Sequence, residues 1–328
     1  MREGPPYYGI LESKQHSDFQ KRNESVNIKY KAALFAIASA FVLALSKFSA
    51  GLTSGSMAVL SSSLDSLLDI FMSGMNFLAI REAAKPADYR HQYGHGKTEN
   101  LAAVVQSLVI IFTGGMIVYK AIDKFLHKGA IHYSGLDLGV MILSVIFSMV
   151  ISTVLRKVGE KSDSSALKAD ALHYSSDLYS NSAAIVAIVL TYYTGITFFD
   201  LFFSVVVAFI LLVSAQKIFR DGFGGLMDTN APSDVEQKLH EIISAMPYPY
   251  AGYHKMRSRV AGSRKYVDFH LLICRDEKID AAHKMADRLE IILAGEIKNL
   301  DTVIHIEPCS NPCGLSEETC AVRKQEGR

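Results

Sequence analysis

Long stretches with few or no charged residues fill the chain between about residues 32 and 216, and they constrain its fold more than any other feature. A helix needs about 20 mostly apolar residues to cross the roughly 30 Å hydrocarbon core of a bilayer. Six stretches are long enough or nearly so, and they cover residues 32–47, 48–81, 100–119, 138–155, 178–199 and 201–216. The sequence therefore predicts a membrane α-helical fold with six transmembrane helices, in a domain over residues 29–222.

Basic residues are concentrated on one side of these predicted helices. The N-terminal tail (residues 1–28) and the loops between the second and third and between the fourth and fifth helices are rich in Lys and Arg. The loops between the first and second and between the fifth and sixth helices carry no basic residue. Because Lys and Arg collect in cytoplasmic loops, both termini are predicted to be cytoplasmic. Nothing in the tail resembles a cleavable signal peptide, and its start is predicted to be disordered.

Residues 229–310 have the pattern of a small α+β domain. Ser233 and Glu236 predict a capping box at the start of a helix, and the stretch 264–273 alternates between apolar and polar residues as a half-buried strand does. Further patterns complete an α-β-β-α-β order, which predicts one helix layer on a three-stranded sheet. Residues 311–328 form a C-terminal tail.

The four cysteines all follow the membrane segments and are predicted to lie in the reducing cytoplasm, which makes disulfides unexpected. Three of them, Cys309, Cys313 and Cys320, are separated by three and six residues, a spacing that fits no standard zinc module. Their role is left open.

Two aspartates interrupt the second apolar stretch, where a charge costs at least about 2.5–3.5 kcal/mol. Asp65 and Asp69 are four residues apart and so share one helical face, and His173 and Asp177 repeat this spacing in the fifth helix. Two such pairs can form a four-coordinate site of carboxylate oxygens and one imidazole nitrogen, which suits Zn²⁺. The alternative is that the aspartates cap helices or pair with a basic residue, for which the apolar runs offer only Lys47. No other acidic residue is expected inside the membrane helices.

Two further clusters of ligand-type residues occur outside the membrane helices. Asp88, His91 and His95 are spaced three and four residues apart in the second-to-third loop, and the alternative there is a polar loop with solvated histidines. The soluble domain carries a second set on polar strand faces and on a helix, whose number favours metal binding over surface histidines. Its members are His254, His270, His283, His305 and Glu307.

The motifs resemble those of the cation diffusion facilitator family, in its bacterial zinc and ferrous-iron efflux subgroup. The resemblance covers about residues 28–310 and rests on the two paired-ligand motifs described above, on "PADYRHQYGHGKTE" and on "VIHIEPCS". It implies an inner-membrane homodimer of six-helix protomers, each with a cytoplasmic metallochaperone-like domain, that exchanges divalent metal for protons by alternating access.

The resemblance also implies roles for single residues. Asp65, Asp69, His173 and Asp177 match the transport site, and Asp88, His91 and His95 match the loop site. His254, His270, His283, His305 and Glu307 match a dinuclear site that helps to hold the two cytoplasmic domains together. Glu307 departs from the aspartate of close relatives and has a longer reach. Lys97 and Asp228 match a charge pair that fastens the membrane halves of the dimer.

The charges of the membrane site predict how metal and proton flow are coupled. Three carboxylates in a membrane cavity cannot all stay ionised without a cation, because burial and mutual repulsion favour their protonated forms. Metal binding must therefore displace protons, and His173 is the expected proton carrier because imidazole titrates near neutral pH.

Two other classes of function fit the sequence less well than a metal/proton antiporter. A metal sensor or scaffold would bind metal without transporting it, and an intramembrane enzyme is disfavoured because no general base or nucleophile accompanies the four ligands.

The formal net charge of +1 does not favour nucleic acid as a partner. The transported metal (Zn²⁺, Fe²⁺, Cd²⁺, Co²⁺ or Mn²⁺) and the proton stoichiometry are left open.

Overall fold

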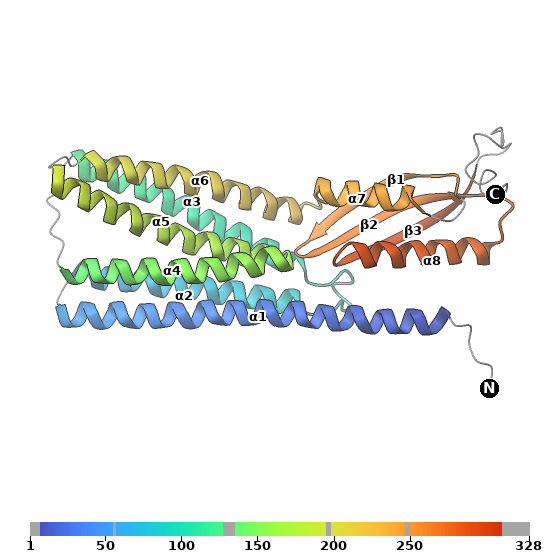
Figure 1. Ribbon diagram of the computed structural model, residues 1–328, viewed down its shortest axis with the longest axis horizontal. Helices are drawn as coiled ribbons and strands as arrows, with labels where there is room; N and C mark the ends of the chain where they lie inside the picture. Colours follow the sequence, from blue (N-terminus) through green and yellow to red (C-terminus); the bar gives the residue numbers. More distant parts are fainter. Residues whose placement is uncertain (1–6, 55–56, 127–134, 195–197, 247–249, 310–328) are drawn as a thin grey trace. The chain divides into compact units, whose positions relative to one another are not determined.

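A computed structural model describes residues 7–54, 57–126, 135–194, 198–246 and 250–309, which are the coloured parts of Figure 1. The chain divides into two compact units, Met1–Phe223 and Gly224–Arg328. This division falls within the short gap, residues 223–228, that the sequence patterns leave between the two expected domains.

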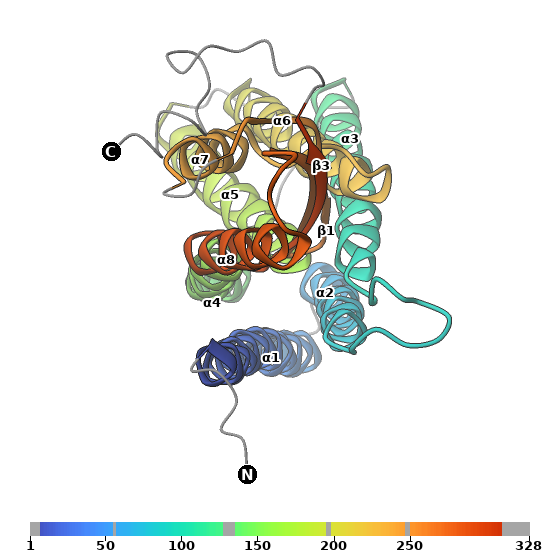
Figure 2. The same cartoon turned by 90° about the vertical axis from the view of Figure 1, so that its right-hand side faces the viewer.

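The first unit consists of six long helices. They are α1 (Tyr7–Ser54), α2 (Met57–Ala83), α3 (Lys97–Leu126), α4 (Gly135–Ser162), α5 (Ser165–Thr194) and α6 (Phe198–Leu226). Helices α1, α2, α4 and α5 pack together, and α3 packs against α2 and α5 (Figure 2). A core cluster of α3 and α6 residues, with Ile110, Val207 and Leu211 at its centre, joins α6 to the bundle.

Four of these helices are long and apolar enough to cross a membrane, judged by length and composition over the part of the chain that the structure describes. They contain the segments Val26–Thr53, Lys97–Asp123, Leu138–Ser162 and Leu201–Leu226. Helices α2 and α5 do not meet that criterion, and they are the two that carry the paired ligand-type residues. The expected count of six transmembrane helices therefore stays a prediction.

Helix α1 begins much earlier than the apolar pattern indicates. The sequence predicts a tail up to residue 28, whereas the helix is continuous from Tyr7. No glycine or proline occurs between residues 10 and 50, and the polar residues before residue 28 include many good helix formers. A hydropathy pattern marks only the part of a helix that is apolar, so it misses such a polar extension.

The second unit is a three-stranded sheet with helices on one face. Its elements are α7 (Ser233–Ser244), β1 (Gly252–Ala261), β2 (Arg264–Ile273), α8 (Ile279–Glu296) and β3 (Leu300–Pro308). The strand order is β1-β2-β3, in which β1 pairs antiparallel with β2 and β2 pairs parallel with β3. Parallel neighbours need a crossover, and α8 provides it. The predicted α-β-β-α-β order is confirmed (Figure 1).

Alternation in β2 separates a buried face from an open one. Val267, Phe269, Leu271 and Ile273 are buried against apolar residues of α7 and α8, so their predicted inward direction is confirmed. The capping box predicted at the start of α7 is wrong. Pro232 is the N-cap there and makes no side-chain cap, and Glu236 instead accepts a hydrogen bond from the Ser258 hydroxyl at 2.8 Å.

Candidate metal sites

The antiparallel helices α2 and α5 bring three of the four ligand-type residues of the membrane unit together. One ligand atom each from Asp69, His173 and Asp177 lies within 4.8 Å of the other two. His173 Nε2 is 2.9 Å from Asp69 Oδ1, and both side chains are only 13% exposed. Ligand atoms around a tetrahedral ion with bonds of about 2.0–2.2 Å lie roughly 3.3–3.6 Å apart, which is between the 2.9 Å of this pair and the 4.8 Å limit of the group, so small side-chain adjustments would fit the three residues around a metal.

Asp65 takes no part in this group. It is exposed, and its carboxylate lies outside the cluster that the other three residues form in the described part of the chain. Lys47, the basic residue that the alternative interpretation required, donates to the hydroxyl of Ser66 at 2.9 Å. Its described polar contact is therefore with a serine rather than with an aspartate of the pair.

Helix α5 also buries an acid that the sequence analysis missed. The expectation of no further acidic residue in these helices is wrong, because Asp170 is 0% exposed and lies one turn before His173. Asp170 lies ahead of the apolar run 178–199 and belongs to neither four-residue pair, so the spacing of the pairs does not mark it. The i, i+3 spacing to His173 was the signal that could have identified it.

The loop between α2 and α3 folds back on itself around Asp88. This carboxylate lies 3.3 Å from both His91 Nδ1 and His95 Nε2, and the three residues form a cluster that could hold a metal ion. The backbone amides of His91 and Arg90 hold the pKa of Asp88 below its ordinary value, so the carboxylate is available as a ligand at neutral pH. The His95 side chain is only 10% exposed, and its buried Nδ1 has no hydrogen-bond partner in the described chain.

A third cluster lies on the open face of the sheet in the second unit. His254, His270 and His305 are register partners across β1, β2 and β3. The ring centroids of His254 and His270 are 5.3 Å apart, and those of His270 and His305 are 4.7 Å apart. A bulge in β1, with Lys255 at φ 51°, allows His254 to stand opposite His270. Glu307 joins the row, with oxygens 2.8 Å from His254 Nε2 and 2.6 Å from His270 Nδ1. His254, His270 and Glu307 could hold a metal ion together.

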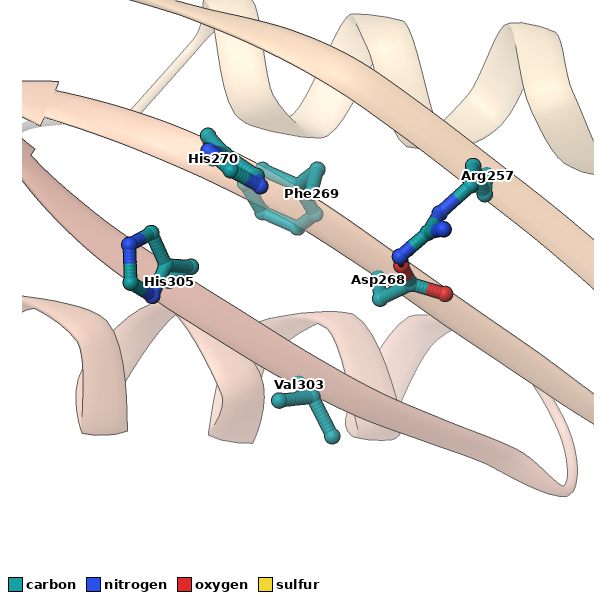
Figure 3. Close-up of a pocket in the computed structure, with 6 residues that line it drawn as sticks. All are labelled: Arg257, Asp268, Phe269, His270, Val303 and His305. Atoms are coloured by element: carbon teal, nitrogen blue, oxygen red, sulfur yellow. Dashed lines mark hydrogen bonds and ion pairs between the residues drawn. The ribbon is translucent and has the colours of Figure 1, made fainter.

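The same face contains a pocket of about 300 Å³ beside these histidines. It is lined by Arg257, Asp268, Phe269, His270, Val303 and His305 (Figure 3). His270 and His305 flank it on neighbouring strands, and Arg257 pairs with Asp268 at 2.5 Å. His305 is farther from the carboxylate, with Nε2 3.9 Å from Glu307 Oε1.

Other expected site residues are not brought together. His283 lies on α8, is 69% exposed and approaches Asp287 of its own helix at 3.6 Å. Asp228 pairs with Arg259 at 3.3 Å, while its expected partner Lys97 belongs to the other unit, so that charge pair stays a prediction. Cys309 is a free thiol at the end of β3, and Cys313 and Cys320 lie outside the described residues.

Glu307 predicts a pH dependence for the stability of the metal-free second unit. Hydrogen bonds from His270 and His254 lower the pKa of Glu307 from its ordinary value of 4.5 to about 2. A carboxylate with a lowered folded-state pKa stabilises the fold above its ordinary pKa, and this contribution is lost as the pH falls toward the folded value. With a chelator present, Glu307→Gln should lower the unfolding temperature at pH 7, and the difference from the parent should shrink from pH 4.5 downward.

Calorimetry of the full chain in detergent would measure this difference. Glu296→Gln is the matched control, since Glu296 is an exposed glutamate of the same unit that pairs with Lys238 alone. A Glu307→Gln effect that is constant between pH 7 and 3 would contradict the prediction.

Comparisons with known proteins identify the family of the chain. The family model described as the cation efflux transmembrane domain matches residues 33–227, and that described as the cytoplasmic domain of cation efflux proteins matches residues 231–309. The cation-efflux pump FieF of Salmonella typhi is 32% identical over 280 residues, which are 85% of this chain and 93% of the relative. FieF of Salmonella newport matches with the same identity and coverage. A solved chain of CzrB is 26% identical over 24% of this chain and 99% of its own length, with a TM-score of 0.23.

The two family models together cover nearly all of the described chain beyond residue 33, and in the expected order. The membrane domain comes first and the cytoplasmic α/β domain follows, as the resemblance implied. The chain therefore belongs to the cation diffusion facilitator family, among the FieF-like cation-efflux pumps, and is a multi-pass membrane protein for the efflux of divalent metal cations.

Proposed function

We propose that this chain exports Zn²⁺ from the cytoplasm in exchange for protons. The observation that carries the proposal is the convergence of Asp69, His173 and Asp177 from two helices, with ligand atoms within 4.8 Å of one another. Two carboxylates and an imidazole make a donor set of mixed oxygen and nitrogen, which Zn²⁺ accepts readily. Cd²⁺, Fe²⁺ and Co²⁺ are tolerable alternatives for the same donors, and Mn²⁺ is better served by oxygen alone.

Asp65 would supply the fourth ligand. It lies one helical turn from Asp69 on the same face of α2, and a change of side-chain rotamer is enough to move a carboxylate over such a distance. Four ligands would close a tetrahedral site around the transported ion. Because the ion is transported and must be released, the bond between the fourth ligand and the ion must also be able to break.

Proton coupling follows from the contact between His173 and Asp69. A hydrogen bond of 2.9 Å between Nε2 and Oδ1 requires a proton between the two atoms. Both atoms bind a metal only when that proton has gone, because metal ligands must be deprotonated. Metal binding therefore releases at least this proton, and return of a proton to the pair assists metal release.

Transport also requires that the site open to each side of the membrane in turn. We place both termini in the cytoplasm and the protein in the inner membrane, on the distribution of basic residues and the family relation. Inward proton flow then drives outward metal flow when the site alternates between the two sides.

The cytoplasmic cluster would act between two copies of the chain. His254, His270, His305 and Glu307 gather on an open sheet face, whereas His283 lies apart on α8. In a homodimer, His283 of one copy would be free to complete a dinuclear site on the other. Lys97 and Asp228 would fasten the membrane halves.

Proteoliposomes offer the direct test of the proposed function. With an acidic interior, the parent chain should take up Zn²⁺ and Cd²⁺ and release protons, with Fe²⁺ and Co²⁺ slower and Mn²⁺ slowest. Metal that binds to the reconstituted protein without crossing the membrane would favour a sensor or scaffold instead.

The dimer role of the cytoplasmic cluster carries its own prediction. Spin labels on the exposed residue Ile279 at the start of α8 should report a shorter distance between the two copies when Zn²⁺ is bound, because shared ligands would draw the domains together. The shortening should be lost in His270→Ala and kept in His240→Ala, a histidine of the same unit outside the cluster. Equal distances with and without bound Zn²⁺ would limit the cluster to metal storage.

A further inference from the structure

We propose that Asp170 is a positioning residue for metal binding, which holds α5 against α2 and α3 so that the ligands on α2 and α5 stay in register. The inference rests on the proposed transport function, because it concerns the same site. Asp170 itself is not a ligand in this proposal. It acts through the helix that carries His173 and Asp177.

Asp170 is the centre of a hydrogen-bond network that joins three helices. Its carboxylate accepts from the hydroxyl of Ser73 on α2 at 3.2 Å and from the amide of Gln106 on α3 at 3.2 Å. The amide of Asn76 on α2 donates in turn to Gln106 Oε1, and the Ser73 hydroxyl lies 2.9 Å from the hydroxyl of Tyr174 on α5. Every member of the network is at most 1% exposed.

The donors of this network all point toward the carboxylate. An ionised carboxylate only accepts hydrogen bonds, and the amides of Gln106 and Asn76 form one donor chain that ends on it. Tyr174 and Ser73 supply the second chain, because Ser73 has one hydrogen and gives it to Asp170 when Tyr174 donates to Ser73. A buried network in which hydrogen bonds from three helices converge on one side chain specifies one arrangement of these helices.

The network lies directly beside the metal ligands on both helices. Ser73 is four residues after Asp69 on α2, which places the two side chains one turn apart on the same face. On α5, Asp170 is three residues before His173, and Tyr174 is three residues before Asp177. The helix faces that the network fastens are therefore the faces that carry the ligands. A displacement of about 1 Å at such a site is enough to impair ligand geometry.

Substitution of Asp170 by asparagine tests the positioning role. The carboxamide introduced at this position would keep one oxygen that can accept from Gln106, but its NH2 group would replace the second oxygen that now accepts from Ser73. A donor would then face the Ser73 hydroxyl, which would have to turn away from its present acceptor. In proteoliposomes, Asp170→Asn should raise the KM for Zn²⁺ about tenfold, in the range found when residues that orient metal ligands are changed, and alter the maximal rate much less. Ser73→Ala, a milder change, should raise the KM in the same direction.

Exchanging the hydrogen-bond donor and acceptor between positions 106 and 170 should restore the KM. In the double variant Asp170→Asn/Gln106→Glu, the carboxylate moves to α3 and the amide to α5, so the link between these helices is restored with reversed polarity. Its KM should return to within about threefold of the parent value, since compensating pairs in direct contact are strongly coupled. Ser144→Ala is the matched control for Ser73→Ala, because Ser144 is a buried serine that donates only to the carbonyl of Val140 in its own helix.

The outcomes separate this inference from the proposed function. A parent-like KM in Asp170→Asn and Ser73→Ala, measured beside an inactive Asp177→Ala, would overturn the positioning role and leave the transport site intact. A lower unfolding temperature with an unchanged KM would also overturn it, since that is the signature of a merely structural acid. Normal transport by Asp177→Ala would instead overturn the proposed function.

Discussion

Asp177→Ala is expected to reduce Zn²⁺ transport by about a hundredfold or more, since it removes one of three converging ligands from an enclosed site. Asp177 shares its cluster with Asp69 and His173, and no other described carboxylate lies within 4.8 Å of all of them to replace it. Asp69→Ala should have a similar effect, because it also removes the hydrogen-bond partner of His173. Initial rates of Zn²⁺ uptake into acid-loaded proteoliposomes measure both variants.

The control for these variants is Glu160→Gln, which changes an exposed carboxylate that pairs with Arg156 on α4. It should transport at the parent rate. All variants should elute at the parent dimer's volume and unfold cooperatively above the assay temperature, so that a loss of uptake is not a loss of fold. Uptake near the parent rate by Asp177→Ala or Asp69→Ala would exclude this cluster as the transport site.

His173→Asp should weaken the preference for Zn²⁺ over Mn²⁺ by about tenfold or more, because it replaces the one nitrogen ligand by oxygen. Zn²⁺ accepts mixed nitrogen and oxygen donors in a tetrahedral array, whereas Mn²⁺ is well served by carboxylates. Uptake of the two ions, each over a pH series and in competition, gives the ratio directly.

A second variant is the control for the substitution itself. His240→Asp makes the same chemical change in the cytoplasmic unit, where His240 contacts the Tyr253 hydroxyl at 2.7 Å. It should leave the metal ratio unchanged. If His173→Asp also keeps the parent ratio and pH profile, helix geometry rather than the donor at position 173 selects the ion.

Much of the fold was predictable because the spacing of apolar residues and the local composition can be read from a short stretch of sequence. The alternation of residues 264–273 determines which face of β2 is buried, and the repeated four-residue spacing indicated that α2 and α5 each present a ligand face. The start of α1 at Tyr7 was not predictable in this way, since a polar helix leaves no apolar pattern. The cap of α7 was missed because Pro232 occupies the position that a capping side chain would need.

The candidate sites were also predictable only as far as local spacing determines them. Spacing placed Asp65 beside Asp69, but Asp65 is exposed and lies outside the cluster, which depends on packing that no spacing describes. Spacing to His173 places Asp170 near the ligand face of α5, but its partners Ser73 and Gln106 come from α2 and α3, 97 and 64 residues away in the sequence. Contacts of that range are set by the packing of helices, and a single sequence does not contain them as a pattern.

The most direct test of the account is a simultaneous measurement of Zn²⁺ and proton flux in the same vesicles. One dye reports Zn²⁺ and another the internal pH, under an imposed proton gradient and then under an imposed Zn²⁺ gradient. A coupled metal/proton antiporter should show opposite fluxes in a constant ratio under both gradients, and the loss of both fluxes together in Asp177→Ala. Zn²⁺ flux without proton flux, or a ratio that changes with the gradient imposed, would contradict it.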